Sequence, residues 1–137
     1  MKLNTHLRFN NGVCKEAMEF YQSCLGGEVS MMTVADSPMA SQMPDKHGYI
    51  MHAVLTKNGV TLLSGSDMMQ DTATLGDNIA IMVDGDSETE AQALFAALTP
   101  EGDVFMPLER QFWGGLFGIV TDKYGIEWAI SFMERKQ

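Results

Sequence analysis

The chain has 137 residues, of which 45% are hydrophobic and 20% charged, as expected for one globular domain with a substantial core. Its net charge of −9 argues against nucleic acid as a partner, because phosphate backbones are bound by clustered Lys and Arg. The sequence holds no run of about 18 apolar residues, so we expect no membrane span. The N-terminus lacks the apolar segment of a secretory signal, and we expect a cytoplasmic protein.

Two cysteines, Cys14 and Cys24, fall ten positions apart in one predicted helix. A helix separates such residues by about 15 Å, and a disulfide needs Cα atoms within about 7 Å, so the two cannot pair with each other. We expect reduced thiols. Cys14 stands at the start of the helix, where the dipole lowers a thiol pKa. No histidine is placed to pair with it, so nucleophilic catalysis is not expected.

Two amphipathic helices are predicted. The first covers CKEAMEFYQSCLGG (14–27), where apolar residues recur at helical spacing and two glycines follow. The second covers SETEAQALFAALTPEG (87–102), with the same apolar spacing. Ser87 and Glu90 form a capping box at its start. Both helices therefore have a predicted buried face, the first has a predicted end and the second a predicted start.

The surroundings of the two helices repeat. The β-like runs LNTHLRF (3–9) and DNIAIMV (77–83) precede them, and GGEVSMMTV (26–34) and EGDVFMPLE (101–109) follow. With an offset of 74, Glu16 and Ala17 fall on Glu90 and Ala91. Each half then continues into a further pair of strands. The chain therefore reads as a repeated β-α-β-β-β unit.

The last two strands of each half form a predicted hairpin. HAVLTKNGVTLLS (52–64) and GIVTDKYGIEWAIS (118–131) align with an offset of 66. Asn58-Gly59 is a strong signal for a type I′ turn. We predict a single α+β domain over 1–137, built from module one (about 1–67) and module two (about 76–133). The modules would form a curved eight-stranded mixed sheet around a cleft, with the helices outside.

Three segments resemble a known family: LRFNNGVCKEAMEFYQSCLGGEV (7–29), IMHAVLTKNGVTLLSGSD (50–67) and FWGGLFGIVTDKYGIEWAISF (112–132). They are similar to the PhnB-like branch of the glyoxalase, bleomycin-resistance and extradiol dioxygenase proteins, the vicinal-oxygen-chelate superfamily. The resemblance implies a paired βαβββ fold and a homodimer. Some members of this branch are described as demethylubiquinone methyltransferases, but the chain has no glycine-rich cofactor loop.

The resemblance also implies where a metal would bind. In metal-using relatives the first and fourth strands of each module supply His, Gln or Glu ligands to a divalent ion. The corresponding positions here are Asn4, Leu63, Asn78 and Ala129. Leu and Ala cannot coordinate a metal, and Asn is a weak ligand for transition metals. A shift of one residue restores no His/Glu set, so no metal or other cofactor is expected there.

An alternative metal site would use histidines. His6 lies two residues after Asn4, on the same face of the predicted strand, and His52 lies on the third strand. With His47 in the preceding loop, three histidines are available for zinc or nickel. Their spacing matches no known motif, and a histidine within a strand is more typically a hydrogen-bonded packing residue. A displaced divalent-metal site using His6 and His52 stays the alternative.

Three functions remain open. The favoured hypothesis is a protein that binds a small molecule of unknown identity without a catalytic metal. Its candidate cleft residues are Asn4, His6, His52, Leu63, Asn78, Trp113 and Ala129. The alternative is a metal-dependent lyase, isomerase or dioxygenase, and the third is a dimer with a closed cleft and an interaction role. The acidic balance would suit a cationic ligand, and it would equally serve solubility. No catalytic residue can be assigned.

Overall fold

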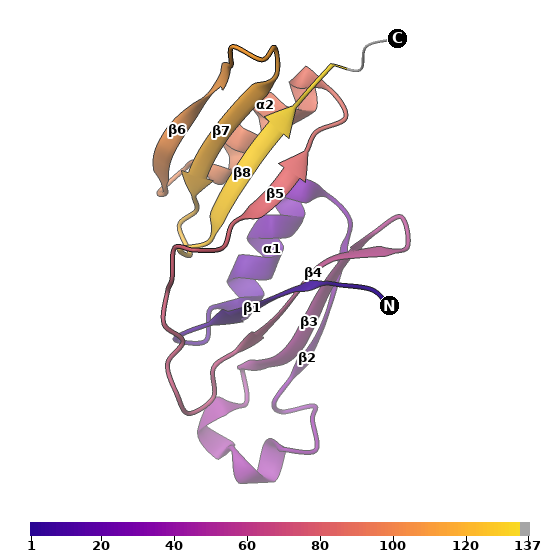
Figure 1. The fold of residues 1–137 in the computed structure, drawn as a ribbon. Coiled ribbons are helices and arrows are strands. Elements are labelled where there is room, and N and C mark those ends of the chain that lie inside the picture. Colours follow the sequence, from indigo (N-terminus) through magenta and orange to yellow (C-terminus); the bar gives the residue numbers. More distant parts are fainter. Residues whose placement is uncertain (135–137) are drawn as a thin grey trace. The chain divides into compact units, whose positions relative to one another are not determined.

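The computed structural model describes residues 1–134, in two compact units, Met1–Thr74 and the residues from Leu75 onward. Each unit contains a four-stranded mixed sheet and one α-helix (Figure 1). The predicted α+β fold with two helices and eight strands is therefore confirmed. The strands form two four-stranded sheets rather than one continuous eight-stranded sheet.

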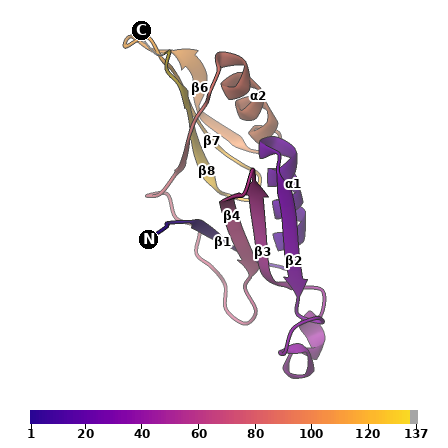
Figure 2. The same cartoon turned by 90° about the vertical axis from the view of Figure 1, so that its right-hand side faces the viewer.

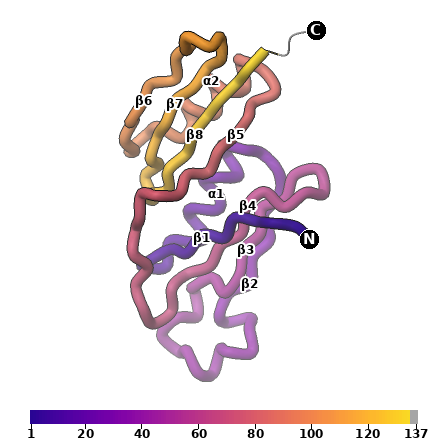
Figure 3. Tube along the Cα trace, viewed as in Figure 1, coloured from indigo at the N-terminus to yellow at the C-terminus, as the bar shows by residue number. Residues whose placement is uncertain are grey.

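The first unit has the strand order β1-β4-β3-β2, in which β1 runs parallel to β4 and the other neighbours are antiparallel. Between β2 and β3 the chain makes a long excursion with two 3-10 turns, η1 and η2 (Figure 3). The elements are β1 (Thr5–Phe9), α1 (Cys14–Leu25), β2 (Glu28–Thr33), η1 (Ala40–Gln42), η2 (Pro44–Lys46), β3 (Ile50–Lys57) and β4 (Val60–Asp67).

The second unit repeats this topology. Its strand order is β5-β8-β7-β6, again with one parallel pair, β5 and β8, and two antiparallel pairs. The elements are β5 (Ile81–Asp84), α2 (Glu88–Leu98), β6 (Asp103–Arg110), β7 (Leu116–Thr121) and β8 (Glu127–Phe132). The sequence repeat therefore corresponds to a repeated βαβββ structure.

Each helix lies on one face of its own sheet (Figure 2), with α1 against β2–β4 and α2 against β7 and β8. In α1 the fully buried residues are Cys14, Ala17, Met18 and Tyr21, at the spacing of one helical face. Phe20, Cys24 and Leu25 are half-buried at the edge of this stripe. In α2 the buried residues are Ala91, Leu94 and Leu98.

The two helices begin in different ways. At α2 the Ser87 half of the predicted capping box is confirmed, since the amide of Glu90 donates to Ser87 Oγ at 3.0 Å. The bond of the Glu90 side chain is displaced by one residue, because Glu90 Oε1 accepts from the Asp86 amide at 2.8 Å. At α1 the N-cap residue has no side-chain bond to the helix. The carboxylate of Asp67, at the end of β4, accepts from the Cys14 amide at 2.9 Å instead. The start of α1 is thus capped by a distant strand.

The two hairpin turns also differ. Asn58 and Gly59 have φ of 53° and 78°, as the predicted type I′ turn requires. The β7–β8 turn is organised by the buried carboxylate of Asp122, whose Oδ1 accepts from the Tyr124 amide at 2.8 Å. Its Oδ2 accepts from Trp128 Nε1, also at 2.8 Å. Trp128 is therefore a core residue tied to the turn.

Two further sequence expectations concern the helices and cysteines. Neither α-helix of the described chain combines the length and the apolar character that a membrane-spanning helix requires. Cys14 and Cys24 are not joined in a disulfide, as their spacing predicted.

Candidate functional site

Strand alternation gives the first sheet two different sides. Leu7, Phe9 and Leu55 are buried on the side that α1 covers. We call the other side the α1-distal face. Its residues come from all four strands: His6 and Arg8 of β1, Ser30 and Met32 of β2, His52 and Val54 of β3, and Ser64 and Ser66 of β4. This face is rich in side chains that form hydrogen bonds.

His6 lies among hydroxyl groups on the α1-distal face. Its Nδ1 lies 2.7 Å from Ser64 Oγ, and its Nε2 lies 3.0 Å from Ser66 Oγ. Both contacts follow from the parallel pairing of β1 with β4, which sets His6 opposite Ser64 and Arg8 opposite Ser66. Because both nitrogens have a partner, the imidazole orientation is fixed although the ring is exposed.

His52 stacks beside His6. The ring centroids are 6.1 Å apart and the planes differ by 23°. The pKa of His6 is lowered from its ordinary value, first by burial and then by the positive charges of His52 and Arg8. A neutral His6 presents one N–H donor and one acceptor nitrogen to its serines. Sequence reasoning placed both histidines in the site, and the structure brings these two together.

The side chains at the positions of the family's metal do not fit a divalent ion. Asn4, Asn78 and Ala129 supply two weak ligands and a methyl group. The alternative pair is also poorly arranged, since coordination through His6 would break one of its two serine bonds. Within residues 1–134, no group of three His, Cys, Asp or Glu side chains is placed to hold a metal ion. His47 bonds the carbonyl of Ala40 through Nε2 at 2.8 Å.

Leu63 lies in the core between the first sheet and α1, where it is 2% exposed, and not on the α1-distal face. The cause is a β-bulge: Leu55 pairs with Leu63 but Thr56 pairs with Thr61, so Leu62 is an extra residue in β4. Without the bulge, Leu63 would have pointed to the α1-distal face. With it, Ser64 takes that place, and the offset of 66 no longer relates like faces of the two hairpins.

Two asparagines of the candidate set lie outside regular structure. Asn4 is exposed and directly precedes β1, two residues before His6. Asn78 is exposed in the segment before β5, in the second unit. Within its own unit, each asparagine stands at the entrance to the first strand.

Ala129 lies in the second unit, on the side of the sheet away from α2, between Met82 of β5 and Ile119 of β7. Its neighbours in β8, Trp128 and Ile130, point toward α2 and are buried. The methyl group of Ala129 is therefore part of an apolar patch.

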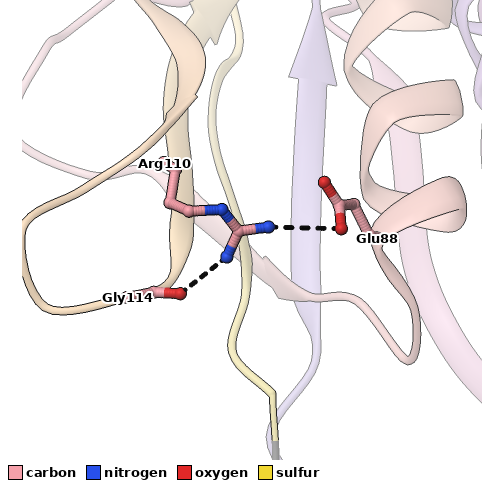
Figure 4. Close-up of polar contacts among 3 residues, drawn as sticks. All are labelled: Glu88, Arg110 and Gly114. Atoms are coloured by element: carbon pink, nitrogen blue, oxygen red, sulfur yellow. Dashed lines mark hydrogen bonds and ion pairs between the residues drawn. The ribbon is translucent and has the colours of Figure 1, made fainter.

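Trp113 occupies the turn between β6 and β7, where it is 48% exposed. Its ring contacts Phe112 and Phe117 edge-on, at centroid distances of 5.0 Å and 6.4 Å. Arg110 holds this turn, since its guanidinium donates to the Gly114 carbonyl at 2.8 Å and pairs with Glu88 at 3.2 Å (Figure 4). These two contacts of Arg110 therefore fix the turn that carries Trp113.

The sequence analysis did not identify Arg8, Ser64 and Ser66 as site residues. The alternation in LLSGSD does place both serines on one side of a strand. Which side they occupy, and that they meet His6, depends on the bulge and on the β1–β4 register. Arg8 shares the face of His6 by the same alternation, so it was accessible from the sequence.

The expectation for Cys14 was wrong. The helix start predicted a lowered thiol pKa, but burial raises the pKa of Cys14 to about 12, and the nearby carboxylate of Asp67 adds to the shift. Asp67 is 4% exposed and also accepts from the Ile50 amide at 2.8 Å. Burial raises the pKa of Asp67, and its bonds to the Ile50 and Cys14 amides oppose that shift. Both groups serve the fold, which agrees with the expectation of no nucleophilic cysteine.

Comparison with known proteins places this arrangement in context. The model of a family described as 3-demethylubiquinone-9 3-methyltransferase matches residues 1–131. Protein YjdN of Escherichia coli K12 is 27% identical over 99% of this chain and 98% of its own length.

Solved structures agree with this result. Protein PA1353 of Pseudomonas aeruginosa has a TM-score of 0.82 at 33% identity, covering 98% of this chain and 100% of that one. The PhnB protein of Bacillus cereus has a TM-score of 0.79 at 29% identity, covering 96% and 99%. A glyoxalase/bleomycin resistance protein/dioxygenase family enzyme of Burkholderia phytofirmans shares the fold, with a TM-score of 0.59 at 11% identity, covering 95% and 98%.

Proposed function

The chain belongs to the family described as 3-demethylubiquinone-9 3-methyltransferase, a PhnB-like family of the vicinal-oxygen-chelate superfamily, and we propose that it is a small-molecule-binding protein. The binding surface is the α1-distal face of the first unit, around His6 and His52. Binding uses hydrogen bonds and ring contacts and requires no resident metal ion.

One observation carries this proposal: an exposed histidine is held at both nitrogens, by Ser64 at 2.7 Å and by Ser66 at 3.0 Å. Packing alone does not require such a network on a sheet face that α1 does not cover. Fixing a polar group before the ligand arrives reduces the entropy lost on binding. Beside it, His52 offers a flat ring and Met32 a flexible apolar side chain, 47% exposed, in the adjacent strand.

Methyl transfer, which the family description names, has less support in this chain. A methyltransferase must hold a methyl donor next to its substrate. The sequence has no glycine-rich loop for such a cofactor, and the strand-to-helix connections, NNGV (10–13) and GDS (85–87), hold one glycine each. A metal-assisted reaction lacks a suitable donor set, as described above for Asn4, Asn78 and Ala129. Binding is therefore the function that the side chains support best.

The test is a fragment titration followed by NMR of the imidazole and methionine methyl groups. The panel contains aromatic, amide, carboxylic acid and amine fragments. We expect at least one class to shift the signals of His6, His52 and Met32 together. The loop residue His47 serves as the internal control and stays unchanged, because it is bonded to its own loop at Ala40. The His52→Ala variant should weaken binding of the same fragments.

Two results would count against the proposal. Fragments that shift only the indole signals of Trp113 would move the binding site to the second unit. Stoichiometric binding of a divalent metal that His52→Ala abolishes would favour the metal-dependent enzyme instead.

A further inference from the structure

We propose that the α1-distal face selects small molecules that carry an oxyanion, either a carboxylate or a phosphoryl-type group, and that Arg8 sets this preference. The inference rests on the binding role proposed above and specifies the chemical class of its ligand. It departs from the expectation that the acidic protein suits a cation.

Arg8 is the positive charge of this face. It lies two residues after His6 on β1, and its register partner on β4 is Ser66, whose hydroxyl lies 3.0 Å from His6 Nε2. Alternate residues of a strand point to the same side, so the guanidinium extends over the same surface as the two histidines. An arginine offers five N–H donors in a planar fork that matches carboxylate and phosphate oxygens.

Among residues 1–134, no acid is seen to form an ion pair with Arg8, and the ion pairs Arg110–Glu88 and Lys123–Glu101 both lie in the second unit. Among the described strand residues of the first sheet that point away from α1, Glu28 is the only acid, and it lies on β2. Strands β1 and β2 are the opposite edges of this sheet, about 14 Å apart at the usual strand spacing. The guanidinium is therefore available to a ligand.

The remaining polar groups add donors around the same point. A neutral His6 donates its N–H to one of the two serines and accepts from the other, so the hydroxyl that accepts from His6 can turn its own O–H toward a ligand oxygen, and His52 contributes a ring N–H. The positive neighbours that lower the pKa of His6, namely His52 and Arg8, also favour a negative charge beside it. A ligand oxyanion would complement both charges.

This face also contrasts with the protein as a whole. At a net charge of −9, the long-range field repels anions. An oxyanion would be held only where short-range donors outweigh that field, because salt screens the field beyond about 8–10 Å. The contrast makes adventitious anion binding elsewhere on the surface unfavourable.

The experiment compares acetate, inorganic phosphate and the neutral acetamide at constant ionic strength. The readout is the NMR shift of the His6 and His52 imidazoles and of the Arg8 guanidinium. Acetate and phosphate should shift all three, and acetamide should shift them far less. A larger response to phosphate would indicate a phosphoryl-type ligand and a larger response to acetate a carboxylate; both support the proposal.

Two variants of equal charge change complete the test. Arg8→Gln should weaken acetate or phosphate binding about tenfold, the loss of one charge-assisted contact. Lys15→Gln removes the same charge from exposed α1, on the other side of the sheet, and should change the affinity by less than about twofold because that charge is screened.

The failures are distinguishable. If acetamide and acetate produce equal shifts at His6 and His52, the face binds small molecules without selecting charge, and only the oxyanion inference is overturned. If Arg8→Gln and Lys15→Gln weaken binding equally, Arg8 has no special role and the inference is also overturned. If none of the probes and no fragment of the panel shifts either histidine, the binding face itself is contradicted.

Discussion

The two units share a framework and differ on the side of the sheet that the helix leaves uncovered. Each joins its first strand to its fourth in parallel, and in each a serine of the fourth strand bonds a side chain of the first on that side. In the first unit Ser64 bonds His6 at 2.7 Å, and in the second Ser131 donates to the carboxylate of Asp84 at 2.6 Å. The side chain that this serine bonds is thus a base in the first unit and an acid in the second.

The residues around Ser64 and Ser131 also differ in charge between the two units. The α1-distal face carries Arg8 and His52, whereas the corresponding face of the second unit is apolar and acidic. Its residues are Met82, Asp84, Met106, Glu109, Phe117, Ile119, Ala129 and Ser131. The repeated β-α-β-β-β pattern therefore preserves the helix-facing core, while the uncovered face has diverged in charge. Function should be sought where the repeats differ.

The largest difference in stability should come from how the helices are capped. Asp67→Ala leaves the buried amides of Cys14 and Ile50 without an acceptor, and we expect a loss of about 3 kcal/mol in the free energy of unfolding. Urea denaturation followed by circular dichroism measures it. The same change at exposed Asp71 is the control and should cost less than about 0.5 kcal/mol. A loss below about 1 kcal/mol for Asp67→Ala would mean that α1 does not depend on β4.

The next largest difference in stability is expected between two glycines on the helix-facing sides of the sheets, Gly118 in the second unit and Gly65 in the first. A Cβ at Gly118 would lie 2.8 Å from the Leu108 amide nitrogen, so backbone must move, and we expect Gly118→Ala to cost about 2 kcal/mol. At Gly65 the nearest atoms are Met18 Sδ and Phe9 Cε2, both at 3.2 Å. Since these side chains can adjust, Gly65→Ala should cost about 1 kcal/mol or less. If the two variants lose the same free energy of unfolding in the urea experiment, the two cores accommodate an added methyl group equally well, which contradicts this prediction.

The local cap of α2 should matter less than the distant cap of α1. Ser87→Ala removes one bond to the Glu90 amide at the surface, and we expect a cost of about 1 kcal/mol. Both tryptophans lie in the second unit, so tryptophan fluorescence during urea denaturation reports this change. Ser87→Asp, which retains an acceptor, should stay close to the parent protein. If both variants lose the same stability, capping is not the cause.

The smallest effect is a pH dependence in the first unit. The pKa of His6 is lowered in the folded state, so the folded protein binds fewer protons than the unfolded chain. Stability should therefore fall as pH drops from about 7.5 to about 5.5, through the ordinary imidazole range. His6→Gln should reduce this fall slightly, as measured by Tm at several pH values. His47→Gln is the control. If Tm falls more steeply with decreasing pH in His6→Gln than in the parent protein, the predicted direction of the pH dependence is contradicted.

Much of this fold was accessible from the sequence because its signals are local. The apolar spacing of 14–27 and 87–102, the Ser87 half of the capping box and the Asn58-Gly59 turn each depend on a few neighbouring residues, and all three are confirmed. The offset of 74 between the halves identified the repeat, and the resemblance identified the PhnB-like family. The division into two four-stranded sheets was not accessible, because strand pairing is not encoded in periodicity.

The candidate site was only partly accessible, for a specific reason. The sequence named His6 from strand alternation and His52 from its place on the third strand, but the bulge at Leu62 reverses the side on which Leu63 points. Nothing in the sequence VTLLS (60–64) indicates that Leu62 is an extra residue in the strand. The raised pKa of Cys14 was missed for a similar reason, since burial and the charge of Asp67 come from tertiary contacts. Properties that depend on register or burial needed the structure.

The most direct test of the central claim, ligand binding on the α1-distal face without a resident metal, is the metal content of untagged protein, followed by thermal unfolding with Ni²⁺, Zn²⁺, Mn²⁺ and Fe²⁺. We predict far less than one metal ion per chain and an unchanged Tm with each ion. One bound ion per chain would contradict the claim, as would a rise in Tm that His6→Ala or His52→Ala abolishes. Either result would make the metal-dependent enzyme the better description.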